Sequence, residues 1–180
     1  MAKAQAERIR SEMKPKVLVT EPIHQKGWDL LTGKVEAVPW KGQTAEPLEM
    51  ALEGVHGVIV RVASLPGEAI RGASRLKIVA KHGVGYDNID VSAATACGVI
   101  VTNTPTANSQ SVAEHALTLL LAVARRVGES CRDIALRSMR PQKVYQGTEL
   151  SGKVLGIVGL GSSGLRLATM ADRGFDMRVI

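Results

Sequence analysis

Short apolar runs and helical stretches alternate along the first hundred residues. The apolar runs are rich in Val, Ile and Leu and show little polar alternation, which is typical of strands buried on both faces of a sheet. Five of them predict strands, at residues 17–19, 35–38, 57–60, 76–80 and 99–101. Helices are predicted between them, at residues 23–31, 46–52, 67–73 and 91–97. This alternation predicts right-handed βαβ units, a parallel sheet and a doubly wound α/β domain.

The pattern changes after residue 104. A single long helix is predicted over residues 109–127, and Ser111 with Glu114 matches a capping box near its start. After His115 this segment is apolar on most faces, so we expect it to be buried on several sides. The remaining predicted elements are a polar helix at 130–139, a buried strand at 153–159, a helix at 165–173 and a strand at 177–180.

These elements predict three parts. Residues 1–14 form a polar leader, residues 15–104 form the first domain, and residues 105–180 belong to a second domain. Since the last predicted strand is only the second strand of its domain, we expect residues 105–180 to be the opening of a longer domain.

Charge adds two basic runs to this picture. The net charge is +6, and many of the basic residues lie in residues 3–16 and residues 125–143. Such a balance can indicate nucleic acid or an acidic membrane surface. Neither run contains interleaved aromatic residues that could stack on bases. We therefore interpret both runs as solvated faces and expect no specific binding of nucleic acid.

Signals for metal binding, secretion and membrane insertion are weak. Cys97 and Cys131 are the only cysteines, and neither they nor the scattered histidines show the spacing of a zinc site. The N-terminal residues lack the apolar core of a signal peptide. The longest mostly apolar stretch, residues 116–124, is too short to cross a bilayer. We expect a soluble cytoplasmic protein that binds no metal and no membrane.

A glycine-rich turn follows the predicted strand at 153–159 and opens a helix. Its sequence is Gly159-Leu160-Gly161-Ser162-Ser163-Gly164. In this setting the first glycine permits a tight turn, the second brings a pyrophosphate against bare backbone, and the third lets the helix pack closely on the strand. The helix N-terminus then offers free N–H groups to phosphate. The pattern predicts a dinucleotide site, although a purely structural glycine turn remains the alternative. An acidic residue about 20 positions further on would favour NAD over NADP, and that choice stays open.

A second glycine-rich segment follows the predicted strand at 76–80, where ligands of open α/β sheets bind. It contains Gly83-Val84-Gly85, whose two glycines would expose N–H groups suited to a carboxylate. Asp87 and Asn88 can lock the turn, and Asp90 can cap the next helix. The alternative is a structural turn between a strand and a helix.

Arg61 stands at the carboxyl end of the predicted strand at 57–60 and could bind the acidic group of a substrate. A surface arginine paired with a nearby carboxylate is an equally good interpretation. Further on, residues 103–115 run from a strand through a turn into the long helix, which suits a junction between two domains. His115 could be a catalytic base, but we interpret it as a packed, hydrogen-bonded structural residue.

Taken in order, these segments resemble the D-isomer-specific 2-hydroxyacid dehydrogenase family. The resemblance runs from Val17 to the last residue, and its specific parts are HGVGYDNID, NTPTANSQSVAEHA and GKVLGIVGLGSSG. The phosphoglycerate dehydrogenase branch looks nearest, followed by the glyoxylate and hydroxypyruvate reductases.

The resemblance implies a flavodoxin-like substrate domain, followed by the truncated start of a Rossmann NAD-binding domain. It implies hydride transfer between NAD(H) and a small 2-hydroxy or 2-oxo acid, in an enzyme that forms a homodimer. It places the substrate carboxylate on Gly83, Val84 and Gly85, with Val84 also on the nicotinamide side. It places Arg61 towards the substrate and Asn108 near the cofactor.

Two departures from the family pattern matter. Ser162-Ser163 stands where family members commonly carry Arg-Ile, so one cation that helps to hold the pyrophosphate is missing. The catalytic arginine, glutamate and histidine of the family lie beyond residue 180, so we expect the 180-residue chain alone to be inactive. The alternatives are a dinucleotide-sensing interaction module of the corepressor kind, or a natural 180-residue product without activity.

Overall fold

The computed structural model describes residues 14–180 and divides into two compact units. The division falls between Pro105 and Thr106, one residue from the boundary expected from the sequence. Except for Lys14, the predicted leader lies outside the described residues. The two units are taken in turn below.

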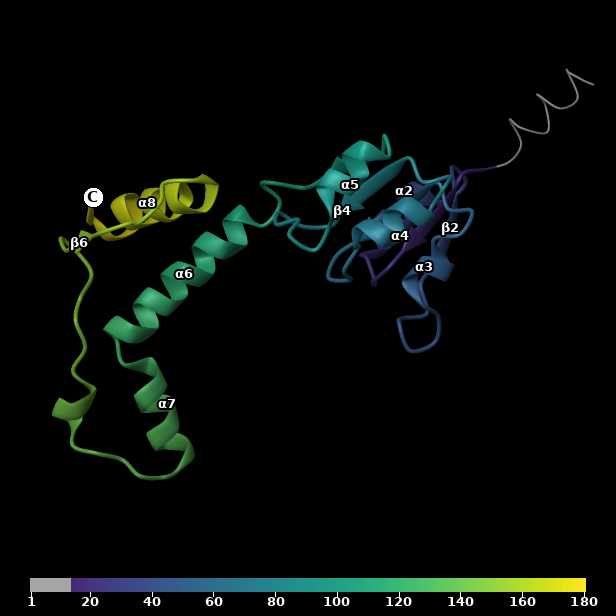
Figure 1. Ribbon diagram of the computed structural model, residues 1–180. Helices are drawn as coiled ribbons and strands as arrows, with labels where there is room; N and C mark the ends of the chain where they lie inside the picture. Colours follow the sequence, from purple (N-terminus) through teal and green to yellow (C-terminus); the bar gives the residue numbers. More distant parts are fainter. Residues whose placement is uncertain (1–13) are drawn as a thin grey trace, which may run out of the picture. The chain divides into compact units, whose positions relative to one another are not determined.

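The first unit is built on a five-stranded sheet in which every pair of neighbouring strands is parallel (Figure 1). The strands are β1 (Lys16–Val19), β2 (Glu36–Pro39), β3 (Gly57–Val60), β4 (Ile78–Lys81) and β5 (Ile100–Thr102). Their order is β2-β1-β3-β4-β5, which is the flavodoxin-like doubly wound order. The predicted fold class is therefore confirmed. The strand order reverses between β1 and β3, and this is where such folds place their ligands.

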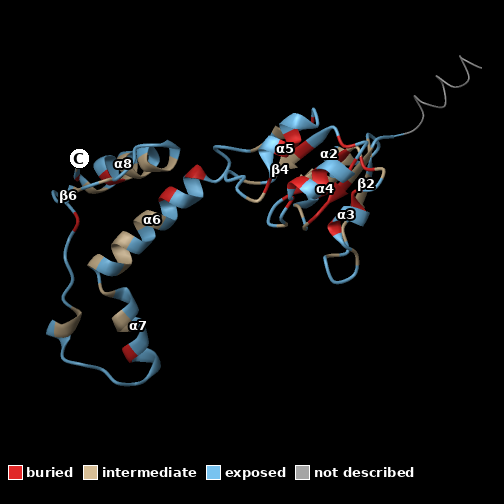
Figure 2. Cartoon of the chain, in the orientation of Figure 1, coloured by how far each residue is buried: buried red, intermediate tan, exposed pale blue. Residues whose placement is uncertain are grey.

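Four short helices cover this sheet. They are α2 (Gln25–Leu31), α3 (Leu48–Ala51), α4 (Gly67–Gly72) and α5 (Val91–Ala96). One apolar core lies between helices and sheet, where buried segments are red in Figure 2. Leu52, Val60 and Val79 in this core have no exposed surface. The central strand β3 is mostly buried, whereas the edge strands β2 and β5 are half-exposed. The β-branched runs thus formed strands because their side chains fill this core.

The second unit begins with two helices, as the sequence predicted, but with different bounds. Helix α6 spans Ser109–Ala124 and α7 spans Val127–Ala135. The two helices are separated by a turn at Arg126, which adopts a left-handed conformation with φ 54°. The Arg126 guanidinium donates to the Glu129 carboxylate, and the backbone carbonyl of Arg126 accepts from the Ser130 hydroxyl. Helix α6 therefore ends three residues before the predicted end, and α7 begins three residues before its predicted start, because these local bonds stabilise a turn at Arg126.

The start of α6 also differs from the prediction. Asn108 is the N-cap residue and makes no side-chain capping bond, while Ser111 already lies inside the helix. The Glu114 carboxylate accepts a hydrogen bond of 2.8 Å from Gln110 instead. The predicted capping box is therefore wrong, because the helix begins two residues before Ser111.

Helix α6 is buried on one side only, so the expectation of burial on several sides is wrong for this chain. Leu120, Leu121 and Ala124 pack against a small core in the second unit. Val112, Leu119 and Val123 are exposed instead, with Val123 at 79%. Their spacing of seven and four residues places them along one helix face. We call these three residues the α6 stripe.

A parallel βαβ unit closes the second unit. It consists of β6 (Val154–Leu155), α8 (Ser162–Phe175) and β7 (Arg178–Val179), and Val154 pairs with Arg178. Strand β6 is shorter than the predicted strand at 153–159, and α8 begins three residues earlier than predicted. The small core beneath them is formed by Leu150, Ala171 and Met177.

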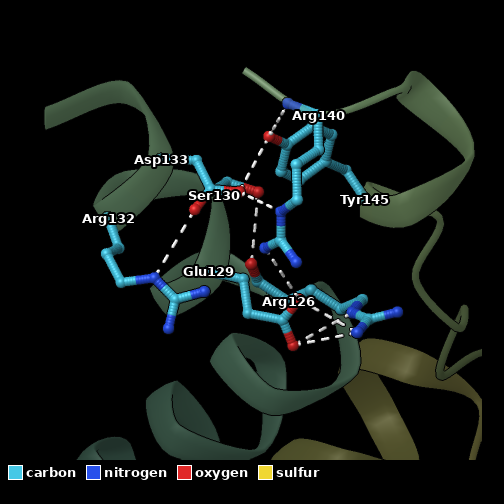
Figure 3. A network of polar contacts seen from close by, with 7 residues as sticks. All are labelled: Arg126, Glu129, Ser130, Arg132, Asp133, Arg140 and Tyr145. Carbon is cyan, nitrogen blue, oxygen red and sulfur yellow. Dashed lines mark hydrogen bonds and ion pairs between the residues drawn. The ribbon is translucent and has the colours of Figure 1, made fainter. Parts of the chain in front are cut away.

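A polar network joins α7 to the short helix η1 (Gln142–Tyr145) (Figure 3). The buried Asp133 carboxylate accepts from the Arg140 Nε at 2.5 Å and from the Tyr145 hydroxyl at 2.9 Å. Its hydrogen bond with Arg140 holds the pKa of Asp133 below its ordinary value, with further support from Tyr145 and Arg132. The network lets η1 pack on α7 although the η1 segment has no buried apolar residue.

Candidate functional site

The carboxyl edge of the first sheet gathers the predicted substrate residues. Because β3 and β4 are neighbouring parallel strands, the loops that follow them leave the same edge. The first, residues 61–63, carries Arg61, and the second, residues 83–85, is the glycine loop. The structure therefore brings Arg61, Gly83, Val84 and Gly85 to one edge. The predicted cofactor residues Asn108 and 159–164 belong to the second unit.

The glycine loop is held by its carbonyl groups, which leaves its N–H groups free. The Gly83 carbonyl accepts from the backbone N–H and the hydroxyl of Thr104, at 3.0 and 3.1 Å. The Val84 carbonyl accepts from the Asn103 side chain at 2.9 Å. Gly83 has φ 156°, a conformation that side chains disfavour. Within residues 14–180 the N–H groups of residues 83–85 donate to no protein acceptor, so they are available to an anion.

The 61–63 loop is bound by a residue that the sequence reasoning missed. Glu21, directly after β1, accepts from the backbone N–H groups of Arg61, Val62 and Ala63 at 2.8, 2.9 and 2.6 Å. Partial burial raises the pKa of Glu21, but the Thr20 hydroxyl and these three N–H groups outweigh it, so its pKa lies below the ordinary value. No sequence pattern marks Glu21, because its partners are backbone groups about 40 residues away.

Two further side chains connect the loops. The Lys81 ammonium donates to the Arg61 carbonyl and to the Asn88 side chain, both at 2.5 Å. Asn88 in turn donates to the Ala63 carbonyl at 2.7 Å. Asn88 therefore secures the neighbouring loop as well as its own turn. Asp90 caps α5 as predicted, accepting from Ala93 N–H at 2.8 Å.

The Arg61 side chain itself is exposed. Among the described residues its guanidinium forms no ion pair, so the paired-surface interpretation is not found in this part of the chain. An open cavity of about 550 Å³ lies beside the loop, lined among others by Glu21, Trp40, Val62 and Ser64. A small polar molecule fits a space of this size.

The glycine turn of the second unit has the geometry expected for its three glycines. Gly159 has φ 92°, as a tight turn requires. Gly161 is the N-cap of α8, and a Cβ atom placed there would meet no atom within 4 Å. A Cβ atom on Gly164 would instead collide with the Gly159 carbonyl oxygen. Gly164 is thus required for packing, whereas Gly161 leaves open space in front of the helix.

The N-terminus of α8 borders that space and carries N–H groups that can donate hydrogen bonds. Ser162 and Ser163 lie in the first turn of α8, where N–H groups have no partner within the helix. Asn108 is exposed at the start of α6, and its side chain makes no capping bond. The N-terminus of α8 and the open space at Gly161 provide the donors and the room that a dinucleotide phosphate requires.

His115 does not match its predicted structural role. It is exposed on α6, and its side chain makes no hydrogen bond within residues 14–180, so its interpretation as a packed residue is wrong. No three His, Cys, Asp or Glu side chains in the described part of the chain lie close enough together to hold a metal ion. No helix among residues 14–180 is long and apolar enough to span a membrane.

A doubly wound parallel sheet followed by a βαβ unit with a glycine-rich turn defines an α/β protein with the architecture of nucleotide-binding folds. Residues 17–173 match the model of the D-isomer specific 2-hydroxyacid dehydrogenase catalytic domain. The chain belongs to this family, which confirms the resemblance inferred from its motifs.

Similar proteins carry two kinds of name. The glyoxylate reductase of Pyrococcus furiosus is 39% identical over 178 residues, covering 93% of this chain and 53% of that protein. The D-3-phosphoglycerate dehydrogenase of Mycobacterium leprae is 42% identical over 156 residues, covering 86% of this chain and 29% of that protein. This chain therefore spans about half the length of the glyoxylate reductases it matches, and less of the phosphoglycerate dehydrogenases.

Solved structures show the same likeness. The TT0316 protein from Thermus thermophilus superposes with a TM-score of 0.81 at 34% identity, covering 91% of this chain and 54% of that one. A 3-phosphoglycerate dehydrogenase from Entamoeba histolytica, described with bound NAD+, superposes with a TM-score of 0.69 at 26% identity, covering 92% and 53%.

Proposed function

We propose that this chain supplies the acid-binding loops and the dinucleotide turn of an NAD-dependent 2-hydroxyacid dehydrogenase. Its substrate is a small 2-hydroxy or 2-oxo acid of the glyoxylate, hydroxypyruvate or 3-phosphoglycerate kind. Residues 15–104 are the substrate domain, and residues 105–180 open the NAD-binding domain. The observation that carries the proposal is the pair of loops on neighbouring strands, in which three N–H groups and the Arg61 guanidinium have no protein partner among residues 14–180.

Each group in this proposal has one task. The N–H groups of Gly83, Val84 and Gly85 bind the carboxylate of the acid, and the Arg61 guanidinium adds a charge-assisted contact. When bound, the nicotinamide supplies or accepts the hydride exchanged with C2 of the acid. The N-terminus of α8 holds the pyrophosphate of NAD, with NADP as a possible substitute, and Asn108 lies near the cofactor. No catalytic residue is assigned within residues 1–180.

The coding sequence downstream of residue 180 provides the direct test. We expect it to encode an arginine, a glutamate and a histidine at the family's catalytic positions, in an enzyme that acts in the cytoplasm. The 180-residue chain alone is expected to oxidise no NADH with glyoxylate or hydroxypyruvate above a control without protein. NADH oxidation by the isolated chain would contradict this assignment of the catalytic groups.

Arg61→Ala is expected to weaken binding of the acid while NAD binding stays unchanged. The change removes a charge that is worth about 1.5–3 kcal/mol in a hydrogen bond to an ionised group, which corresponds to roughly a tenfold loss or more. Binding of glyoxylate to the 180-residue chain can be followed by NMR. Arg75→Ala, at an exposed position before β4, is the matched control. Equal affinity in both variants would reduce Arg61 to a surface residue.

The α6 stripe supports a homodimer as part of this proposal. Three large exposed apolar side chains along one helix face form a continuous apolar row, and such rows often mark surfaces of association. We expect the chain to self-associate and to bind a hydrophobic dye. Leu119→Gln combined with Val123→Gln should reduce both effects, whereas Leu30→Gln in the first unit should not. Sedimentation and dye fluorescence measure the outcome, and a dye-free monomer in the unmodified chain would contradict it.

A further inference from the structure

The loop at residues 61–63 is fixed almost wholly by side chains from other elements, and Glu21 makes most of the bonds. We propose that Glu21 is a positioning residue, which holds this loop in the form that presents Arg61 to the acid. The inference rests on the proposed function, because it concerns how Arg61 comes to face its ligand. It assigns no direct contact between Glu21 and substrate.

The hydrogen bonds of the loop show why an anchor is needed. Residues 61–63 follow the end of β3 and precede the isolated bridge between Leu65 and Ile89. Among the described residues, their three N–H groups have Glu21 as their only protein acceptor. Their carbonyl groups at Arg61 and Ala63 accept from Lys81 and Asn88. Without these side chains the loop has no backbone partner to define its position.

The chemistry of the anchor requires a carboxylate. A carboxylate has two oxygen atoms and donates nothing, so it can accept several N–H groups at once. In Glu21, Oε1 accepts from Val62 and Ala63, while Oε2 accepts from Arg61 and from the Thr20 hydroxyl at 2.5 Å. A glutamine would turn an NH₂ group towards N–H groups that need an acceptor. The shape of Gln fits the site, but its donor pattern does not.

The place of Glu21 in the fold links it to both loops. It follows β1 at the point where the strand order reverses, and it lines the cavity beside the 61–63 loop. Through Lys81 and Asn88 the same loop is tied to the two residues that flank the glycine loop. Four donors already compensate the negative charge of Glu21, so it can stand near an acidic ligand with little repulsion.

Glu21 could affect acid binding through its negative charge or through its anchoring of the loop, and the two effects change the affinity of Glu21→Gln in opposite directions. Removing a negative charge near an acid would strengthen acid binding by simple electrostatics. Loss of the anchor would weaken acid binding, because Arg61 no longer occupies one position. We expect glyoxylate to bind the Gln variant about tenfold more weakly, with NAD binding unchanged. Glu36→Gln, which removes an equal charge at the amino end of the sheet, is the control and should bind as the unmodified chain does.

Amide signals test the anchor without activity. In the unmodified chain the N–H signals of Arg61, Val62 and Ala63 should shift together as Glu21 is protonated at acidic pH. Because its folded pKa is lowered, the anchor is complete above the ordinary Glu value and is lost as pH falls through the folded value. Glu21→Gln should abolish this joint shift and speed hydrogen exchange at the three sites, while Glu36→Gln leaves both intact.

The possible outcomes distinguish the positioning role of Glu21 from the proposed function of the chain. Unchanged amide signals in Glu21→Gln, or changed signals with unchanged or tighter glyoxylate binding, would overturn the positioning role while leaving the proposed function in place. An unmodified chain that binds none of glyoxylate, hydroxypyruvate and 3-phosphoglycerate would overturn the proposed function and this role with it. Should Glu21→Gln fail to fold, hydrogen exchange at Val62 and Ala63 in the unmodified chain decides. Glyoxylate at a hundred times its dissociation constant should slow exchange there by up to about a hundredfold, and unchanged exchange would overturn the proposal.

Discussion

Gly161→Val is expected to weaken NAD binding by at least about tenfold, which is about 1.4 kcal/mol, while the second unit stays folded. Gly161 has φ −78° and ψ −167°, which any residue can adopt, and a Cβ atom there would meet open space. The valine therefore costs the protein little and occupies the place where the pyrophosphate meets the backbone. Calorimetry with NAD and the circular dichroism of the variant measure the two parts of this prediction.

A matched substitution in the same helix controls for general effects. Gly174 lies near the end of α8, and a Cβ atom there also meets no neighbour. Gly174→Val should retain NAD affinity, because it is remote from the first turn of the helix. Equal affinity of Gly161→Val and the unmodified chain would remove the glycine turn from the cofactor site.

Gly164→Ala is expected to destabilise the second unit by about 1–3 kcal/mol, although alanine is the better helix former. The added methyl group would press on the Gly159 carbonyl oxygen and lie 3.5 Å from the Ile157 Cγ2 atom. Gly159 cannot move away easily, because its φ of 92° already suits only glycine. We expect a lower midpoint of urea unfolding for the second unit.

The sign of the stability change distinguishes close packing at Gly164 from ordinary helix propensity. In an unconstrained helix, replacing Gly by Ala stabilises by up to about 1 kcal/mol, and Gly174→Ala should behave in that way. A Gly164→Ala variant that is as stable as the Gly174→Ala variant would show that α8 can move away from the turn. The close packing described for Gly164 would then be incidental.

The strands were predictable because short runs of apolar residues are enough to identify segments that pack into the core. The run at residues 57–60 is Gly-Val-Ile-Val, with no polar side chain, and it forms the mostly buried central strand β3. The two glycine-rich segments could also be predicted from sequence, because glycines directly after a strand indicate a tight turn or a close approach of a ligand to the backbone. In both cases the information is local, and a short stretch of sequence carries it.

The errors arise where structure depends on particular side-chain bonds rather than on periodicity. The apolar pattern of residues 109–127 places the end of this helix three residues too late, since the turn at Arg126 is stabilised by side-chain bonds involving Glu129 and Ser130. The exposed α6 stripe was misread because periodicity predicts an apolar face without stating whether a partner covers it. Glu21 escaped detection because a carboxylate that binds backbone N–H groups has no partner residue type to search for.

The anchoring of residues 61–63 through their backbone has an evolutionary consequence. Glu21 holds peptide groups, so the identities of Val62 and Ala63 are not part of the bond pattern. Val62 is 74% exposed and also lines the neighbouring cavity. Ala63 packs against the core, whereas the side chain at position 62 can vary while the loop keeps its course. Such a scaffold separates the conservation of shape from the diversification of ligand preference, and a designer could retune it at Val62 without rebuilding the sheet.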